Sequence, residues 1–329
     1  MKKKHLFILF FLLCAGVIAQ EVTTIAATIL DEETKKPLAF VNIGFAEKGI
    51  GTVSNTEGNF SLTWLEGAIE DAAFLEISSI GYETKKIPIS ELKQLTSYKV
   101  EVLLAPTQYT LDEVLVINEK REYDKTGSGS YTKQKVGYWM NSQGLGGEIA
   151  TKIDIGHNNT QLHDLTFNIE DNKADSLLVR IKVYDYHRGK PGKNLLGQNI
   201  YHTISKKKGI ETIPLKKYNI LVNEDIIVSL ELVKIYGNTI YFEVSASPYK
   251  GISFTREVSL GGWEVYRGVG IAFSLLTSYP SKDGIQTFVD RTKPKTIDVF
   301  WDTSYALHLR STTEELQLLK KYLRSLGEV

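Results

Sequence analysis

Five aromatic side chains between residues 135 and 280 have the types that bind sugars. Sugar rings stack their apolar faces on such side chains, while loop carboxylates and amides bind the hydroxyls. Packing inside a β-sandwich core is the favoured alternative, since such cores also use Trp and Tyr. Tyr184 is out of phase with its apolar neighbours, so we expect it to be exposed. The five candidates are Trp139, Tyr184, Tyr186, Trp263 and Tyr266.

Catalytic chemistry has weaker support in the sequence. Ser, His and Asp are all present, but no Gly-x-Ser-x-Gly elbow occurs. His157, His163, His187 and His202 are irregularly spaced, and we interpret them as structural or surface residues. The glycine-rich segment 144–147 lacks the Lys-Ser/Thr ending of a phosphate loop and is predicted to be a turn. We therefore predict no catalytic residue, no metal site and no cofactor.

The first 19 residues have the pattern of a secretory signal peptide. A basic start is followed by the apolar stretch 6–18, with small residues before the expected cleavage point. Cys14 is the only cysteine, and the leucines before it disfavour lipoprotein cleavage, so the mature chain is expected to lack a thiol. Without its three signal lysines the chain has 36 basic and 39 acidic residues, a net charge of −3. That balance argues against nucleic acid as a partner, and we expect no transmembrane span in the mature chain.

Residues 22–118 contain short runs of alternating apolar residues separated by turn residues, the pattern of a β-sandwich. A single helical turn is expected at 90–94. Residues 119–134 are rich in charge, Gly and Ser, and we predict a linker there. The expected strands are 24–30, 39–44, 59–63, 74–78 and 100–104.

Residues 135–280 again show β-type alternation, which predicts antiparallel sheets with one polar, solvated face. Gly237-Asn238 separates the runs 228–232 and 239–244 and predicts a hairpin. A second sandwich of jelly-roll type is expected. Residues 285–329 predict a strand at 296–301 and a helix after the capping box that starts at Ser311.

The motifs of residues 22–118 resemble the carboxypeptidase-like regulatory domain of Bacteroidetes envelope proteins. This resemblance implies a transthyretin-like β-sandwich that commonly heads TonB-dependent outer-membrane receptors. No receptor plug or long barrel follows here. A zinc carboxypeptidase needs His followed three residues later by Glu, and no histidine of this chain has that spacing. The matching residues are Pro37-Leu38, Gly51-Thr52, Glu57-Gly58-Asn59-Phe60, Ser79-Ile80-Gly81-Tyr82 and the exit strand 111–116.

The tail is similar to the start of a von Willebrand factor A domain, whose Asp-x-Ser-x-Ser motif holds a magnesium ion. Asp302 and Ser304 match this motif, but Ala306 replaces the last serine. Because two side chains cannot supply octahedral oxygen ligation, we expect no working metal site. Two interpretations remain open for the tail: a truncated α/β domain, or a strand and helix packed on the second sandwich.

These patterns favour an exported, non-enzymatic envelope protein, mainly β in fold, that acts as an interaction or structural module. We place it in the periplasm, in the outer membrane or at the cell surface, with envelope proteins or glycans as partners and an association with TonB-type systems. One alternative is a carbohydrate-binding accessory protein that uses the second sandwich. An exported hydrolase is a further alternative.

Overall fold

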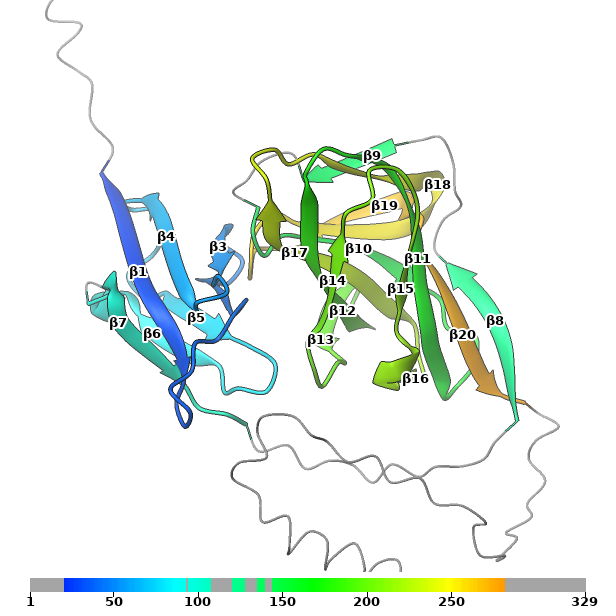
Figure 1. Cartoon of the computed structure of the whole chain (residues 1–329), viewed down its shortest axis with the longest axis horizontal. Coiled ribbons are helices and arrows are strands. Elements are labelled where there is room, and N and C mark those ends of the chain that lie inside the picture. Colours follow the sequence, from blue (N-terminus) through cyan, green and yellow to red (C-terminus); the bar gives the residue numbers. More distant parts are fainter. Residues whose placement is uncertain (1–20, 93, 108–119, 128–134, 140–143, 282–329) are drawn as a thin grey trace, which may run out of the picture. The chain divides into compact units, whose positions relative to one another are not determined.

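The computed structural model describes residues 21–92, 94–107, 120–127, 135–139 and 144–281. Within these residues the regular structure is almost entirely β, which confirms the predicted fold class (Figure 1). No helix in this part of the chain has the length and apolar character needed to span a membrane. The signal segment, the exit strand 111–116 and the tail 285–329, with Asp302 and Ser304, lie outside the described residues.

The N-terminal sandwich consists of a three-stranded and a four-stranded sheet. Strand β1 lies between β4, which is antiparallel to it, and β7, which is parallel. Helix α2 forms the short helical turn that the sequence predicted. The first sheet contains β1 (Val22–Asp31), β4 (Asn59–Leu65) and β7 (Thr96–Leu104), and the second contains β2 (Asn42–Phe45), β3 (Ile50–Val53), β5 (Phe74–Ser78) and β6 (Lys85–Pro88), followed by α2 (Ile89–Leu92).

The turn before β4 explains one of the sequence motifs. The side-chain oxygen of Asn55 accepts hydrogen bonds from the backbone N–H groups of Glu57 and Asn59, at 3.0 and 2.8 Å. Gly58 has a φ of 75°, a region that L side chains rarely adopt. A Cβ on Gly58 would also lie 2.5 Å from the carbonyl oxygen of Ile29. The motif therefore encodes a tight turn against β1.

The second sandwich is formed, within the described residues, by 13 paired strands, and β18 belongs to both faces. The main path of pairing is β13-β12-β17-β10-β18-β11-β20-β8, and β9, β14, β15, β16 and β19 pair with strands of this path. The first part of β18 pairs with β9 and β11, and its later part pairs with β10 and β19. The strands are β8 (Arg121–Gly127), β9 (Lys135–Trp139), β10 (Glu148–Ile153), β11 (Thr160–Asn172), β12 (Ser176–His187), β13 (Lys190–Asn194), β14 (Ile200–Ile204), β15 (Gly209–Pro214), β16 (Leu221–Val222), β17 (Ile226–Tyr236), β18 (Phe242–Arg256), β19 (Glu264–Ile271) and β20 (Ser274–Pro280), with one 3-10 turn, η1 (Lys216–Tyr218).

The core of the second sandwich lies between these two faces. Every second residue of β12 and β17 enters it, including Val179, Ile181 and Val228, all with no exposed surface. Side chains of β11, such as Leu165 and Phe167, complete it from the other face. The period-two apolar pattern therefore predicted the inner face correctly.

Two expectations about connectivity are wrong. Arg121–Gly127, within the predicted linker, forms β8 and pairs with β20. The sequence does not predict this strand, because most of its side chains are exposed and it therefore has no apolar alternation. The predicted hairpin at 237–238 does not form, since β10 lies between β17 and β18. Turn chemistry shows where a chain reverses, but it does not determine which strand becomes the neighbour.

Candidate functional site

A row of four charged residues crosses four neighbouring strands of the second sandwich. In the order β12, β17, β10 and β18, the row is Arg180, Glu231, Glu148 and Arg256, each directly opposite the next. The two carboxylates are cross-strand neighbours, an arrangement that destabilises a sheet unless cations intervene.

Lys182 supplies the intervening cation. Its ammonium group lies 2.9 Å from Glu148 and 3.0 Å from Glu231. Arg180 pairs with Glu231 at 2.5 Å, and Arg256 pairs with Glu148. We call these five residues the ion cluster. Both carboxylates are almost completely buried, so each needs several partners.

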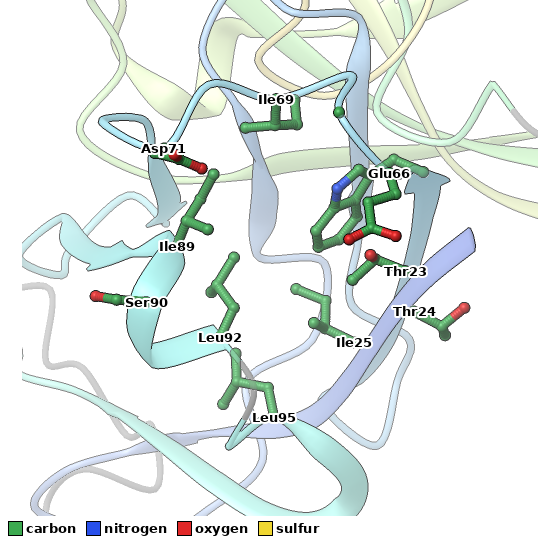
Figure 2. Close-up of a pocket in the computed structure, with 12 residues that line it drawn as sticks. Thr23, Thr24, Ile25, Glu66, Ile69, Asp71, Ile89, Ser90, Leu92 and Leu95 are labelled. Atoms are coloured by element: carbon green, nitrogen blue, oxygen red, sulfur yellow. The ribbon is translucent and has the colours of Figure 1, made fainter. Parts of the chain in front are cut away.

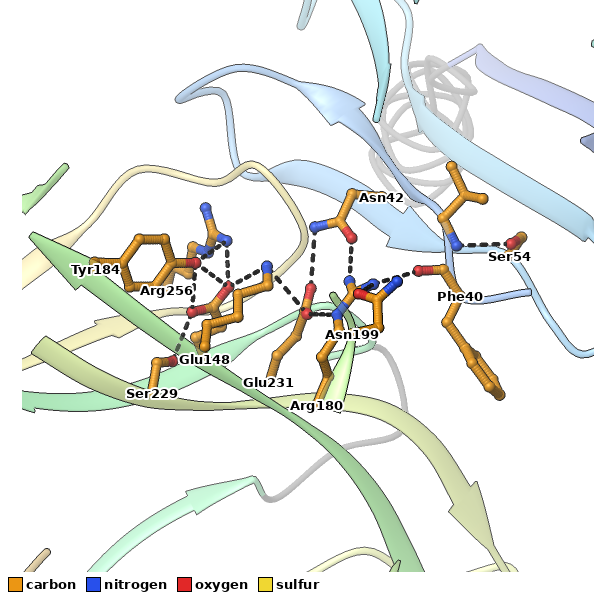
Figure 3. A network of polar contacts seen from close by, with 12 residues as sticks. Phe40, Asn42, Ser54, Glu148, Arg180, Tyr184, Asn199, Ser229, Glu231 and Arg256 are labelled. Atoms are coloured by element: carbon orange, nitrogen blue, oxygen red, sulfur yellow. Dashed lines mark hydrogen bonds and ion pairs between the residues drawn. The ribbon is translucent and has the colours of Figure 1, made fainter. Parts of the chain in front are cut away.

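Neutral donors complete the coordination of Glu148. The Tyr184 hydroxyl donates to it at 3.0 Å, and the Ser229 hydroxyl at 2.6 Å. Figure 3 shows Tyr184 of β12, Ser229 of β17 and Arg256 of β18 around the Glu148 carboxylate.

The N-terminal sandwich covers the other end of the ion cluster. The Asn42 amide nitrogen donates to Glu231 at 3.0 Å, and its oxygen accepts a bond from Arg180. Arg180 also donates to the Phe40 carbonyl oxygen at 2.8 Å (Figure 3). Here the predicted solvated face is wrong: Arg180 and Lys182 are 2% and 6% exposed because another part of the chain covers them.

The pKa shifts in the ion cluster follow from burial and charge. Burial by itself raises the pKa of Glu148, but Arg256, Lys182 and the Ser229 hydrogen bond together lower it to about 2. Glu231 behaves in the same way, with burial opposed by Arg180 and Lys182, so its pKa is lowered. Burial lowers the pKa of Lys182 despite both carboxylates. The acids are thus ionised and paired, which suits a structural contact better than proton transfer.

Three of the five predicted aromatic residues come together beside the ion cluster. Trp263 packs edge-on against Tyr184, with ring centroids 5.8 Å apart, and Tyr186 and Phe254 complete the group. Tyr184 is 7% exposed, so the expectation that it is exposed is wrong. Tyr184 lies on the same covered face of the sheet as Glu148, and its hydroxyl donates a hydrogen bond to that carboxylate.

Trp139 and Tyr266 lie away from this group. Trp139 is 5% exposed and stacks on Phe242 in the core. Tyr266 pairs with Ser253 on β18, one position from Phe254, and therefore projects from the opposite face of the strand pair. At 44% exposed, Tyr266 is the most accessible of the five candidates.

A pocket of about 430 Å³ opens next to Trp263. We call it the Trp263 pocket. The Arg256 guanidinium lies 4.7 Å from the centre of the Trp263 ring, a cation–π contact that fixes both groups. The pocket is lined by Glu47, Lys190, Arg256, Leu260, Gly261, Gly262 and Trp263.

A second pocket, of about 600 Å³, lies in the N-terminal sandwich. Figure 2 shows Ile25, Ile89, Leu92 and Leu95 around it, with the Glu66 carboxylate among the lining side chains. Its lining combines these apolar side chains with the polar side chains of Thr23, Thr24, Glu66, Asp71 and Ser90. Such a pocket can hold a small ligand whose apolar part packs on the isoleucine and leucine side chains.

One Ser–His pair has hydrogen-bond geometry, yet it is inaccessible. His163 Nε2 lies 2.8 Å from the Ser278 hydroxyl, and these residues are 4% and 1% exposed. Arg121 donates to the same hydroxyl at 3.0 Å. A nucleophile must reach its substrate, so this arrangement fits a structural role. Among the described residues, no three His, Cys, Asp or Glu side chains gather as a metal site requires.

The fold and motifs define the N-terminal sandwich as a carboxypeptidase-like regulatory domain, and the family model for the CarboxypepD_reg-like domain matches residues 25–116. The resemblance found in the sequence is thereby confirmed for this segment. The chain is also similar to the TonB-dependent receptor SusC of Bacteroides thetaiotaomicron, with 28% identity over 171 residues. That match covers 48% of this chain and only 16% of the receptor.

Solved structures give weaker likenesses. The cysteine protease and lectin-like domains of Cwp84, a surface layer associated protein of Clostridium difficile, have a TM-score of 0.32 and 10% identity, covering 73% of this chain and 58% of that one. The infectious bursal disease virus Gx strain has a TM-score of 0.24 and 11% identity, covering 80% and 66%. Both TM-scores are too low to support an argument about this chain.

The ion cluster is not predicted by the sequence pattern. The sequence feature that belongs to the cluster is the alternation of Arg180 and Lys182 with the apolar residues of β12. The same pattern describes an ordinary solvated face. Only the arrangement of β10, β17 and β18 beside β12, together with Asn42, turns it into a buried contact.

Proposed function

We propose that this protein is an exported, non-enzymatic envelope protein that acts as an interaction or structural module in association with outer-membrane TonB-type systems. The observation that carries the proposal is the carboxypeptidase-like regulatory domain at residues 25–116, together with the similarity to a TonB-dependent receptor. The predicted signal peptide supports export.

The polar groups of the second sandwich support a structural role. The carboxylates of Glu148 and Glu231, whose pKa values are lowered, bind cations of neighbouring strands. The buried His163–Ser278 pair is closed to a substrate. Perturbed pKa values occur in structural ion-pair networks as well as in active sites. Here the ion-pair partners of Glu148 and Glu231 account for the lowered pKa values.

Contacts between the two sandwiches suggest how such a module works. Asn42 and the Phe40 carbonyl bind the ion cluster, and the backbone N–H of Glu47 donates to the Leu260 carbonyl at 2.9 Å. Phe40 also packs against Tyr201, with centroids 5.4 Å apart. These contacts join the regulatory domain to the second sandwich, so a partner that binds one sandwich would lie beside the other.

The test is cell fractionation combined with cross-linking in a Bacteroidetes host that expresses the tagged full chain. We expect the protein in the envelope fraction, cross-linked to outer-membrane components of a TonB-type system. The matched control lacks residues 1–19 and should remain in the cytoplasm. Recovery of the full chain in the cytoplasm, or cross-links only to cytoplasmic proteins, would contradict the proposal.

A second candidate function is carbohydrate binding by the second sandwich. The Trp263 pocket favours it, because its volume falls within the range of small-ligand sites and it combines an aromatic wall with charged groups. No corresponding observation favours the hydrolase alternative.

A further inference from the structure

The ion cluster contains an excess positive charge. Within the described residues, two carboxylates, Glu148 and Glu231, face three basic side chains, Arg180, Lys182 and Arg256. These groups are buried or nearly so, and an uncompensated charge in such a place is strongly unfavourable. Burial is the largest cause of the lowered pKa of Lys182, and Arg180 and Arg256 act in the same direction.

Arg256 is the member of the ion cluster that lines the Trp263 pocket. Its side chain is 10% exposed, and one of its terminal nitrogens binds Glu148. Its Nε is buried and has no hydrogen-bond partner among the described residues. Leaving a buried charged donor unpaired is costly, so the guanidinium of Arg256 has unused hydrogen-bonding capacity.

The rest of the pocket supplies a second cation and an aromatic wall. Lys190 lines it with a side chain that is 59% exposed, and its distant partner Glu47, at 3.9 Å, is 78% exposed. Trp263 is held in place by the edges of Tyr184 and Phe254 and by Arg256. A rigid aromatic ring beside two cations is prepared for a flat-faced ligand that carries an anion.

We propose that the Trp263 pocket binds an acidic sugar of the uronic acid class, with the sugar carboxylate at Arg256 and Lys190 and the ring against Trp263. This inference rests on the second candidate function, carbohydrate binding, and names its ligand class. A carboxylate in the pocket would pair with the Arg256 guanidinium and neutralise the excess charge of the ion cluster. Charge-assisted hydrogen bonds of this kind are stronger than neutral ones.

The test is isothermal titration calorimetry of the full chain with three sugars that differ only at carbon 6: glucose, glucuronate and glucose 6-phosphate. We expect glucuronate to bind at least about tenfold more tightly than glucose, since a hydrogen bond to a charged group contributes roughly 1.5–3 kcal/mol. Acetate tests the carboxylate without a ring and should bind much more weakly than glucuronate.

Equal affinity for glucose and glucuronate would overturn the proposal, as would binding of neither. Tighter binding of glucose 6-phosphate would overturn the carboxylate assignment, and acetate binding equal to glucuronate would overturn the role of the ring.

Two lysine variants provide matched controls at the pocket. Lys190→Gln should weaken glucuronate binding about two- to fivefold and leave glucose unaffected, as expected for an exposed ion contact. Lys193→Gln changes a nearby exposed lysine that does not line the pocket and should bind as the unaltered chain does. Identical effects of the two substitutions would contradict the assigned site. These titrations do not involve envelope partners. A negative result would therefore contradict the sugar site but not the envelope role, which the fractionation experiment tests separately.

Discussion

At the scale of single residues, Glu148 is a buried carboxylate that is bound, within the described residues, by four other side chains. It lies opposite Glu231 on the next strand and accepts bonds from Lys182, Tyr184 and Ser229. A buried carboxylate with this many donors stays ionised far below its usual range. Its ionisation is therefore linked to the stability of the fold.

We predict that the stability of the protein falls in acid through Glu148. The pKa of this group is depressed from 4.5 to about 2 in the folded chain. The unfolded state therefore binds protons first, so the contribution is complete above about pH 4.5 and is lost as pH falls toward 2. Urea unfolding at a series of pH values measures this loss.

The variant Glu148→Gln should be destabilised by about 3–5 kcal/mol at pH 7, because it leaves buried cations without their partner. Its difference from the unaltered chain should narrow near pH 2. Glu224→Gln, at an exposed position, serves as the control and should keep the full acid dependence. An unchanged pH slope in Glu148→Gln would show that another group is responsible.

At the scale of elements, strands β2 and β3 meet the loop between β18 and β19 at two glycines. A Cβ on Gly51 would lie 1.9 Å from the Ser259 carbonyl oxygen, and one on Gly44 would lie 2.8 Å from the same atom. Real Cβ atoms do not approach a backbone oxygen this closely. The glycine of the Gly51-Thr52 motif therefore lets the two sandwiches pack backbone against backbone.

Gly51→Ala is accordingly expected to destabilise the protein by roughly 1–3 kcal/mol through overpacking. Gly156→Ala is the matched control, since a Cβ there meets nothing within 4 Å and its φ is not positive. Thermal unfolding of both variants measures the difference. If Gly51→Ala is as stable as Gly156→Ala, the loop does not need this close approach.

At the scale of the whole molecule, Asn42 couples the two sandwiches. One amide side chain binds a carboxylate and a guanidinium of the ion cluster at the same time. Neither charged group is removed when Asn42 is changed, so the contact between the sandwiches can be weakened without creating a new charge imbalance.

For Asn42→Ala we expect a loss of about 1–3 kcal/mol, the usual result of leaving buried polar groups unpaired. We also expect urea unfolding to separate into two transitions, because less free energy couples the sandwiches. Asn238→Ala, at an exposed loop position, should unfold as the unaltered chain does. Circular dichroism and tryptophan fluorescence followed together reveal the separation, and coincident curves in Asn42→Ala would count against the coupling.

Much of the local structure could be predicted from the sequence. Phe74–Ser78 forms a strand with the predicted bounds, and the turn at Asn55 has the chemistry that its motif indicated. These features depend on neighbours only a few residues away, so their signal lies within a short window. The grouping of Trp263 with Tyr184 and Tyr186 was only partly accessible, because side-chain type does not indicate which strands become neighbours.

The sequence alone determined the β character of the chain, the regulatory domain and the inner faces of the strands. Tertiary structure decided whether the polar face of the second sandwich is exposed or buried. Asn42 and Glu231 are 189 positions apart, and neither local alternation nor turn chemistry connects them. Burial is a property of what covers a face, so a charged row that would be solvated on an isolated sheet becomes the contact that joins the two sandwiches.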